Sequence, residues 1–291
     1  MVIRKPGKPN YTLAKAYRPI SLLQTLSKAL ELAIARRISY LTETYNLLPE
    51  NHFGGRRQRS CEQALNVLVE KVHDAGRRGR VLSLVTFDVQ GAFNGVYTDI
   101  LCQRLQQRWI PREIVKWMRS FCSNRKAAVM VGKYTSEVQQ IEHPGLPQGS
   151  PLSPICFDYY NANLVEGKID GKGGSLGFID DYSAWVVGPS EGENTILIQN
   201  TIIPRATKWA EESGAIFEAG KTGFIHFTKK RITEPIALDF NGALVPPQNS
   251  VKLLGVVMDS KMSMREHIRK VTTKALKVVG SIRTLRDLHP T

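Results

Sequence analysis

The chain has 291 residues, enough to bury a substantial core and to divide into two or three subdomains. Hydrophobic residues make up 42% of it and charged residues 23%, a balance that excludes a globally disordered chain. Forty Lys and Arg against 26 Asp and Glu give a net charge of +14, which favours a polyanionic partner such as nucleic acid but equally fits an unspecialised basic enzyme.

The sequence also limits the compartment. No apolar run at the N-terminus resembles a signal peptide, and no segment approaches the roughly 18 apolar residues of a membrane span. The four cysteines are widely spaced and the six histidines are scattered, so neither a disulfide framework nor a zinc site is predicted. We therefore expect an intracellular protein, nuclear or cytoplasmic, with reduced, mostly buried thiols and no membrane partner.

The N-terminal part of the chain is predicted to be mainly helical. A long amphipathic helix is expected over 21–47, where Leu26, Leu30 and Ile38 are among the apolar residues at helical spacing. A basic loop at 51–60 breaks this pattern, and Ser60 suits the N-cap of the next helix. Further helices are expected over 62–73, 97–108 and 111–122, with a solvated turn at 75–80 and a β-rich run at 81–87.

The C-terminal part is richer in strands and turns. Apolar runs at 175–179 and 183–187 flank Asp180 and Asp181, so this acidic pair is predicted at a hairpin turn. The other expected elements are a hairpin at 126–132 and 136–141, a Pro and Gly-rich loop at 144–154, a helix at 193–213, β-like pieces at 222–227, 236–240 and 251–258, and a basic amphipathic tail at 262–285. Hairpins and long helices without βαβ regularity predict an α+β fold with helices on one face of a sheet.

Two acidic strings are the most informative about chemistry. Asp88 ends the strand at 81–87, and Asp180 and Asp181 follow a second strand, so a suitable fold would bring these carboxylates together at one end of a sheet. Such carboxylates hold divalent metal ions, which activate an attacking hydroxyl and stabilise the charge on a leaving phosphate. Taken singly, each string is more often an ordinary turn, because Asp is a common turn former.

Further strings surround these carboxylates in a definite order. They are Asp88–Phe93, Gly145–Pro154, Phe178–Asp181, Ala219–Thr222 and Leu253–Gly255. This ordered set resembles the successive palm motifs of reverse transcriptases, and Tyr17–Leu23 and His52–Arg56 are similar to the fingers motifs of the non-LTR, LINE-like branch. The resemblance extends over nearly the whole chain, from about residue 5 to residue 267.

The resemblance implies a right-hand polymerase of the α+β class. Its palm would be an antiparallel sheet backed by helices, with helical fingers and a truncated thumb. The implied divisions are fingers at 1–80, palm at 81–110, a fingers and palm insertion at 111–141, palm at 142–258 and the start of the thumb at 259–291. The endonuclease that accompanies this domain in the family is missing here, so we expect a fragment of a retroelement polyprotein.

By the same resemblance, the activity is RNA-directed DNA synthesis, with dNTPs added to a DNA primer on an RNA template. Two Mg²⁺ ions, or Mn²⁺ in their place, would be held by Asp88, Asp180 and the backbone carbonyl of Val89. Asp181 would stand beside them as a third catalytic carboxylate. Lys221 would protonate or neutralise the leaving pyrophosphate.

The resemblance also assigns nucleotide binding. Arg18 and Lys5 would bind the triphosphate, and the planar fork of an arginine suits phosphate oxygens. Phe93 would stand under the sugar, where its bulk would exclude a ribose 2′-hydroxyl. Gln148 would pack on the incoming base and template.

Contacts with template and primer are implied for four further positions. Arg56 lies in the basic loop and would touch the template backbone, although a basic surface loop explains it nearly as well. Gly149 would allow close backbone approach. Leu254 and Gly255 would belong to the primer grip, where a glycine lets the primer strand pass close to the backbone.

The chain departs from the family pattern in several places. Asn94 stands where an aspartate is usual, Ile179 replaces a commoner alanine, Arg57 interrupts a loop normally rich in Pro and Gly, and Asp158 puts a charge in an ordinarily apolar helix. None of these changes removes an expected metal ligand. Two alternatives stay open, a catalytically inactive nucleic-acid-binding remnant of a retroelement and an RNA-templated RNA polymerase; Phe93 argues against the latter.

Overall fold

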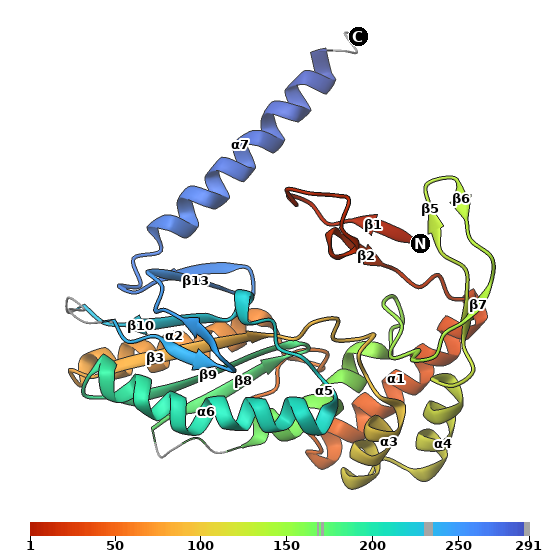
Figure 1. Ribbon diagram of the computed structural model, residues 1–291, viewed down its shortest axis with the longest axis horizontal. Coiled ribbons are helices and arrows are strands. Elements are labelled where there is room, and N and C mark those ends of the chain that lie inside the picture. The colour runs from red at the N-terminus through yellow and green to blue at the C-terminus, as the bar shows by residue number, and fades with distance from the viewer. Residues whose placement is uncertain (168, 170–171, 230–234, 288–291) are drawn as a thin grey trace.

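A four-stranded antiparallel sheet forms the centre of the molecule (Figure 1). The computed structural model describes every residue except 168, 170–171, 230–234 and 288–291. The strands lie in the order β10 (Gly223–Phe227), β3 (Val81–Asp88), β9 (Asp181–Gly188) and β8 (Gly174–Phe178). β8 and β9 form the hairpin predicted around the acidic pair, and β3 pairs with β9 along its whole length.

The two faces of this sheet bury different side chains. Alternation along β3 sends Val85 and Phe87 into one core cluster and Leu82 and Leu84 into another. The covering helices are α5 (Ser153–Glu166) and α6 (Glu191–Ser213) on the first face and α2 (Cys61–Arg77) on the second. The prediction of helices on one face is therefore incomplete, because the apolar stripe of α2 covers the opposite face.

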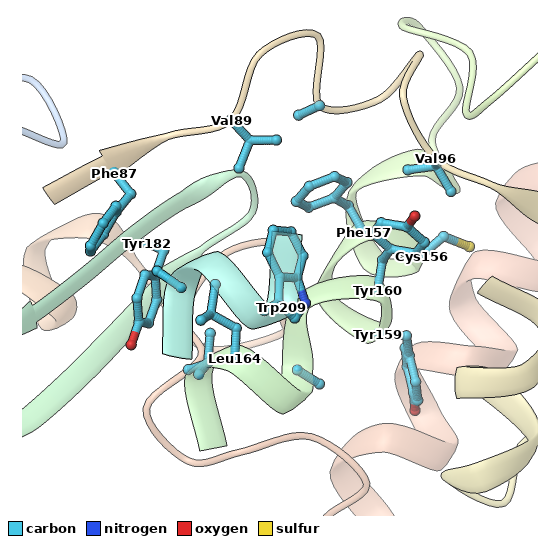
Figure 2. Close-up of a cluster of buried hydrophobic side chains, with 14 of the residues drawn as sticks. Phe87, Val89, Val96, Cys156, Phe157, Tyr159, Tyr160, Leu164, Tyr182 and Trp209 are labelled. Carbon is cyan, nitrogen blue, oxygen red and sulfur yellow. The ribbon is translucent and has the colours of Figure 1, made fainter. Parts of the chain in front are cut away.

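Aromatic rings fill the first face and hold the strand ends in place (Figure 2). Phe87 of β3 stacks on Tyr182 of β9, with 5.5 Å between the ring centroids. Tyr160 of α5 packs edge-to-face on Trp209 of α6 and extends this cluster. Phe87 directly precedes Asp88 and Tyr182 directly follows Asp181, so the buried rings anchor the backbone beside both carboxylates.

The remaining helices and several small two-stranded ribbons lie outside the sheet and its covering helices (Figure 1). The helices are η1 (Ala14–Ala16), α1 (Thr25–Tyr45), α3 (Thr98–Gln107), α4 (Arg112–Phe121), η2 (Ala219–Lys221) and α7 (Arg265–Asp287). The ribbons are β1 (Val2–Arg4) with β2 (Tyr17–Pro19), β4 (Lys126–Ala127) with β7 (Gln139–Gln140), β5 (Met130–Val131) with β6 (Tyr134–Thr135), β11 (Leu238–Phe240) with β12 (Ala243–Val245), and β13 (Ser250–Leu253) with β14 (Val256–Asp259).

The helices follow the predictions in type but differ in detail. Ser60 caps α2 through its side chain and the backbone N–H of Gln63, and Gln63 returns a bond to the Ser60 backbone. α2 continues to Arg77, so the turn predicted at 75–80 begins later than expected. The prediction of a buried apolar face is wrong near the start of α1, where Leu26 and Leu30 are 83% and 51% exposed.

Two predictions about composition can be compared with the structure. All four cysteines are free and three of them are buried, as expected of reduced thiols. None of the helices in the described part of the chain is both long and apolar enough to cross a membrane. α7 projects away from the body (Figure 1), and its side chains from Ile268 to Ile282 are exposed.

Candidate active site

Three acidic residues stand at one end of the central sheet. The β3–β9 register sets Asp88 directly opposite Asp181. Asp180 stands with Ile179 in the two-residue turn that joins β8 to β9, since Phe178 pairs with Asp181. The structure therefore brings together the acidic residues that the sequence predicted to converge, with Asp181 inside the strand and Asp180 in the turn.

Burial and neighbouring negative charge raise the pKa values of Asp180 and Asp181. Burial raises the pKa of Asp181 to about 6, and the charges on Asp180 and Asp88 add to the effect, while Lys252 opposes it. Burial likewise raises the pKa of Asp180, with Asp88 acting in the same direction and the Arg18 guanidinium acting against it. These interactions place Arg18 and Lys252 within electrostatic reach of the acidic group.

Lys221 lies beside Asp88. Its ammonium donates a hydrogen bond to Asp88 Oδ2 at 2.8 Å and also contacts Glu218. The backbone brings it there, because the N–H of Glu218 donates to the carbonyl of Asp88 at 3.0 Å. Partial burial lowers the pKa of Lys221, but its hydrogen bonds to the two acids outweigh burial and leave the pKa raised.

A cavity of about 440 Å³ opens beside these side chains. Asp88, Asp181 and Lys221 line it together with Lys252 and the turn formed by Leu254 and Gly255. That turn joins β13 to β14 with φ values of 46° at Leu254 and 88° at Gly255, as two-residue hairpin turns require. A left-handed conformation is unusual for leucine, and here it occurs in the hairpin turn that lines the cavity.

The donors of the acidic group are of the kind that bind divalent cations. Among the residues that the structure describes, no three or more His, Cys, Asp or Glu side chains converge closely enough to form a metal site by themselves. The donors at the sheet end are nevertheless hard carboxylate oxygens, and the neighbouring carboxylates contribute to the raised pKa values of Asp180 and Asp181. Mg²⁺ is commonly held by one or two carboxylates with substrate phosphates as its further ligands.

The Pro and Gly-rich loop connects two of the predicted nucleotide-binding residues. The N–H of Leu146 donates to the carbonyl of Phe93 at 2.7 Å. A side chain at Gly145 would lie 2.6 Å from the same carbonyl oxygen, so only glycine permits this approach. The Phe93 ring packs at 5.6 Å from the ring of Phe157 and is half-buried. The structure thus joins Phe93 to the loop that carries Gln148.

The same loop also reaches the N-terminal strands. The N–H of Ser21 donates to the carbonyl of Gln148 at 2.7 Å, and a Cβ at Gly149 would lie 2.9 Å from the Ser21 carbonyl oxygen. Ser21 closely follows Arg18, which is exposed on β2. Arg18, Gln148 and Gly149 therefore belong to one connected surface near Asp180.

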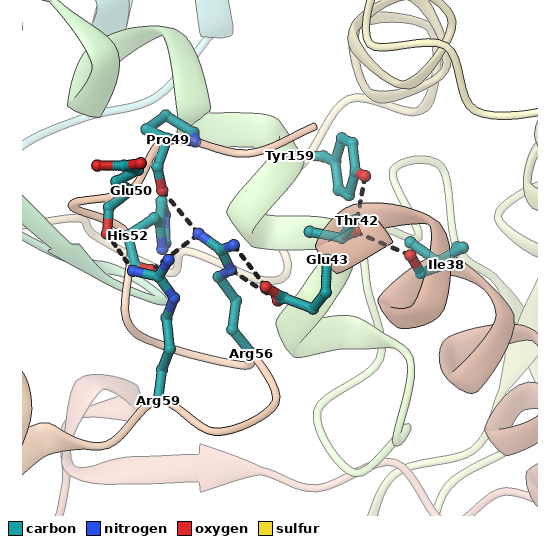
Figure 3. A network of polar contacts seen from close by, with 9 residues as sticks. All are labelled: Ile38, Thr42, Glu43, Pro49, Glu50, His52, Arg56, Arg59 and Tyr159. Atoms are coloured by element: carbon teal, nitrogen blue, oxygen red, sulfur yellow. Dashed lines mark hydrogen bonds and ion pairs between the residues drawn. The ribbon is translucent and has the colours of Figure 1, made fainter. Parts of the chain in front are cut away.

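Lys5 and Arg56 are placed differently from the other predicted residues. The Lys5 ammonium donates to the carbonyl of Lys15 at 3.1 Å, a contact within the N-terminal segment. Arg56 is buried, and its side chain binds Glu43 at 2.9 and 2.8 Å and the carbonyl of Pro49 at 2.7 Å (Figure 3). The donors of Arg56 are therefore used inside the protein, and its contact with the template stays a prediction.

Glu31 is a buried acid that sequence reasoning missed. It accepts a hydrogen bond from Ser27 at 2.8 Å and another from Ser150, and so ties the loop after Gln148 to α1. The signal was present, because Glu31 lies on the same helical face as Ala35 and Ile38 and shares their burial.

Comparisons with known proteins identify the family of this chain. The family model for reverse transcriptase (RNA-dependent DNA polymerase) matches residues 3–258. A probable RNA-directed DNA polymerase from transposon X-element of Drosophila melanogaster is 29% identical over 94% of this chain and 30% of its own length. The RNA-directed DNA polymerase from mobile element jockey of Drosophila funebris is also 29% identical, over 92% of this chain and 29% of its own length.

The chain thus spans less than a third of the length of these relatives. Among solved structures, telomerase from Candida tropicalis in complex with a fragment of telomeric RNA shares the fold, with a TM-score of 0.55 and 11% identity over 80% of this chain and 36% of that chain. The motif order, the palm-like sheet and the family match lead to one conclusion. The chain belongs to the reverse transcriptase (RNA-dependent DNA polymerase) family, in its non-LTR retrotransposon branch.

Proposed function

We propose that this chain catalyses RNA-directed DNA synthesis, in which dNTPs are added to the 3′-hydroxyl of a DNA primer on an RNA template. One observation carries the proposal. The β3–β9 register sets Asp88 opposite Asp181 beside a cavity that also presents Lys221 and the Leu254–Gly255 turn. Membership of the family supports the type of reaction.

The acidic group would hold the metal ions. Asp88 and Asp180 would supply carboxylate oxygens to Mg²⁺ or Mn²⁺, the carbonyl of Val89 a further oxygen, and Asp181 a third carboxylate nearby. When bound, the ions supply positive charge that lowers the pKa of the primer hydroxyl and stabilises the phosphates. Lys221 would carry the proton that neutralises the leaving pyrophosphate, which its raised pKa supports.

The surface built by the Pro and Gly-rich loop would receive the nucleotide. Arg18, exposed and within electrostatic reach of Asp180, would bind the triphosphate. Phe93 would stand under the sugar and reject a ribose. Gln148 has a buried side-chain oxygen without a hydrogen-bond partner among the described residues, which supports a role as an acceptor toward the incoming nucleotide or template.

The division into parts follows the same proposal. Fingers would comprise 1–80, palm 81–110 and 142–258, the insertion between them 111–141, and the thumb would begin at 259. The Leu254–Gly255 turn and Gly149 would contact primer and template.

Primer extension on an RNA template, with purified chain and Mg²⁺, tests the proposal. Asp88→Ala and Asp180→Ala should abolish dNTP incorporation, while Asp99→Ala, which removes an exposed acid on α3, should leave it unchanged. Wild-type rates in Asp180→Ala would refute the assignment of the acidic group. No synthesis by the wild-type chain would favour a nucleic-acid-binding remnant, and preferential use of NTPs would favour an RNA polymerase.

A further inference from the structure

The segment from Asn51 to Arg56 lies under the turn that carries Asp180. Its backbone pairs with β8, because the N–H of Phe53 donates to the carbonyl of Gly177 at 2.8 Å and the N–H of Gly177 to the carbonyl of Asn51 at 3.0 Å. A Cβ at Gly54 would lie 2.2 Å from the Ile179 nitrogen. The segment therefore touches the turn itself, in the space that only a glycine leaves.

A buried polar chain connects this segment to the turn. The side-chain amide of Asn161, on α5, donates to the carbonyl of Ile179 at 2.7 Å. Its amide oxygen is 2.8 Å from Nε2 of His52. Because the Asn161 nitrogen is used on Ile179, the oxygen must accept, and His52 therefore donates from Nε2. Both side chains are buried.

The turn needs such support. Ile179 adopts a φ of 56°, a left-handed conformation that is strongly unfavourable for a β-branched residue. Strained residues of this kind persist only where their surroundings hold them. The hydrogen bond from Asn161 acts on the carbonyl of Ile179, which is bonded directly to the nitrogen of Asp180.

Hydrogen bonds also hold the other end of this series of buried polar residues, at His52. Arg56 donates to the carbonyl of His52 at 3.3 Å and binds Glu43 of α1 with two hydrogen bonds. Figure 3 shows Arg56 beside His52 and Glu43. The connection from Glu43 of α1 through Arg56, His52 and Asn161 to the Ile179 carbonyl is thus continuous, and the three residues between the partly exposed Glu43 and Ile179 are buried.

We propose that Asn161, oriented by His52, is a positioning residue for Asp180. It fixes the strained Ile179–Asp180 turn and thereby the direction in which the Asp180 carboxylate can meet a divalent cation. This inference rests on the proposed function of Asp180 as a metal ligand. Groups that orient metal ligands without touching the metal commonly change metal affinity or activity by 10–100-fold when they are removed.

Mn²⁺ provides a probe that does not depend on DNA synthesis. Binding of Mn²⁺ to the full chain, measured by electron paramagnetic resonance in the presence of dNTP, should weaken about tenfold or more in Asn161→Ala. Asn161→Asp keeps the shape but loses the donor toward Ile179, and should weaken binding similarly. Asn163→Ala is the matched control, because Asn163 is exposed on the same helix and its side-chain oxygen accepts a hydrogen bond from Nη2 of Arg108.

His52 provides the second comparison. His52→Gln retains a donor that can reach Asn161 and should restore most of the Mn²⁺ affinity that His52→Phe loses. In primer extension, Asn161→Asp should lower kcat while the KM for dNTP changes little. Circular dichroism and urea titration identify a temperature at which every variant is folded.

The outcomes separate this inference from the proposed function. Wild-type Mn²⁺ affinity in folded Asn161→Asp, or equal loss in Asn163→Ala, would overturn the positioning role. Failure of the wild-type chain to extend a primer would instead refute the proposed function. In that case a selective loss of Mn²⁺ binding in Asn161→Asp would still uphold the positioning role, because binding is measured without catalysis.

Discussion

The Arg56→Ala variant tests whether the Arg56 side chain stabilises the fold or contacts nucleic acid. The Arg56 side chain is only 2% exposed, whereas its partner Glu43 is 32% exposed. Removing the guanidinium leaves the carbonyls of Pro49 and His52 without this donor. Loss of the hydrogen bond to each of these two carbonyls costs about 1 kcal/mol, and loss of the partly buried ion pair with Glu43 costs about 1 kcal/mol more. We therefore expect Arg56→Ala to lower the free energy of unfolding by about 3 kcal/mol.

Urea denaturation measures that loss, and the salt dependence of nucleic-acid affinity provides the second measurement. A lysine or arginine on a phosphate contributes about 0.7–0.9 to the slope of log affinity against log salt concentration. Arg56→Ala should leave this slope unchanged. Arg57→Ala is the matched control, since Arg57 is the exposed neighbour and should leave folding stability unchanged. Normal stability with a reduced slope in Arg56→Ala would show that Arg56 contacts nucleic acid.

Phe93→Val should admit ribonucleotides, because the ring is the bulk proposed under the sugar; an unchanged ratio of NTP to dNTP incorporation in primer extension would exclude Phe93 from sugar selection. Burial lowers the pKa of His226 to about 4, against 6.5 in the unfolded chain. Because the unfolded chain takes up a proton at His226 more readily than the folded protein does, folding stability is unaffected by protonation of His226 above pH 6.5 and falls as the pH is lowered toward 4. Urea titrations should therefore show about 3 kcal/mol less folding stability at pH 4 from this group. His226→Gln should flatten that dependence, and a wild-type slope in the variant would contradict the assignment. Burial also raises the pKa of Asp158 well above its usual range, and both carboxyl oxygens lack hydrogen-bond partners within the described structure. Because the folded protein disfavours the ionised Asp158 carboxylate, this residue lowers folding stability increasingly as the pH rises. Asp158→Asn should therefore increase the free energy of unfolding at pH 8 by about 1–2 kcal/mol, and a lower urea midpoint in this variant would contradict the prediction.

Local patterns in the sequence predicted the type and order of most elements. Ser60 and Gln63 form the capping box of α2, as a side-chain signal within one turn can specify. The apolar runs around Asp88 and Asp180 predicted β3, β8 and β9, because strand residues carry their alternation locally. The ordered motifs also indicated the family, since the order of motifs is a property of the sequence alone.

Exposure was less predictable than secondary structure. Leu26 and Leu30 satisfy the helical spacing of α1, yet both are exposed. Glu31 is charged but fully buried, where it accepts hydrogen bonds from Ser27 and Ser150. Periodicity shows which residues share a helix face, but the element that packs on that face determines which of them are buried.

The sequence by itself determined which residues carry carboxylates and where along the chain they stand, because the acidic strings and strand patterns are local. Only the tertiary structure decided that Asp88 lies opposite Asp181, since that register joins residues far apart in the chain. It also decided that Arg56 is buried and that Asn161 holds the Ile179 carbonyl. Hydrogen bonds and burial of this kind depend on long-range packing, which no local pattern of residues contains.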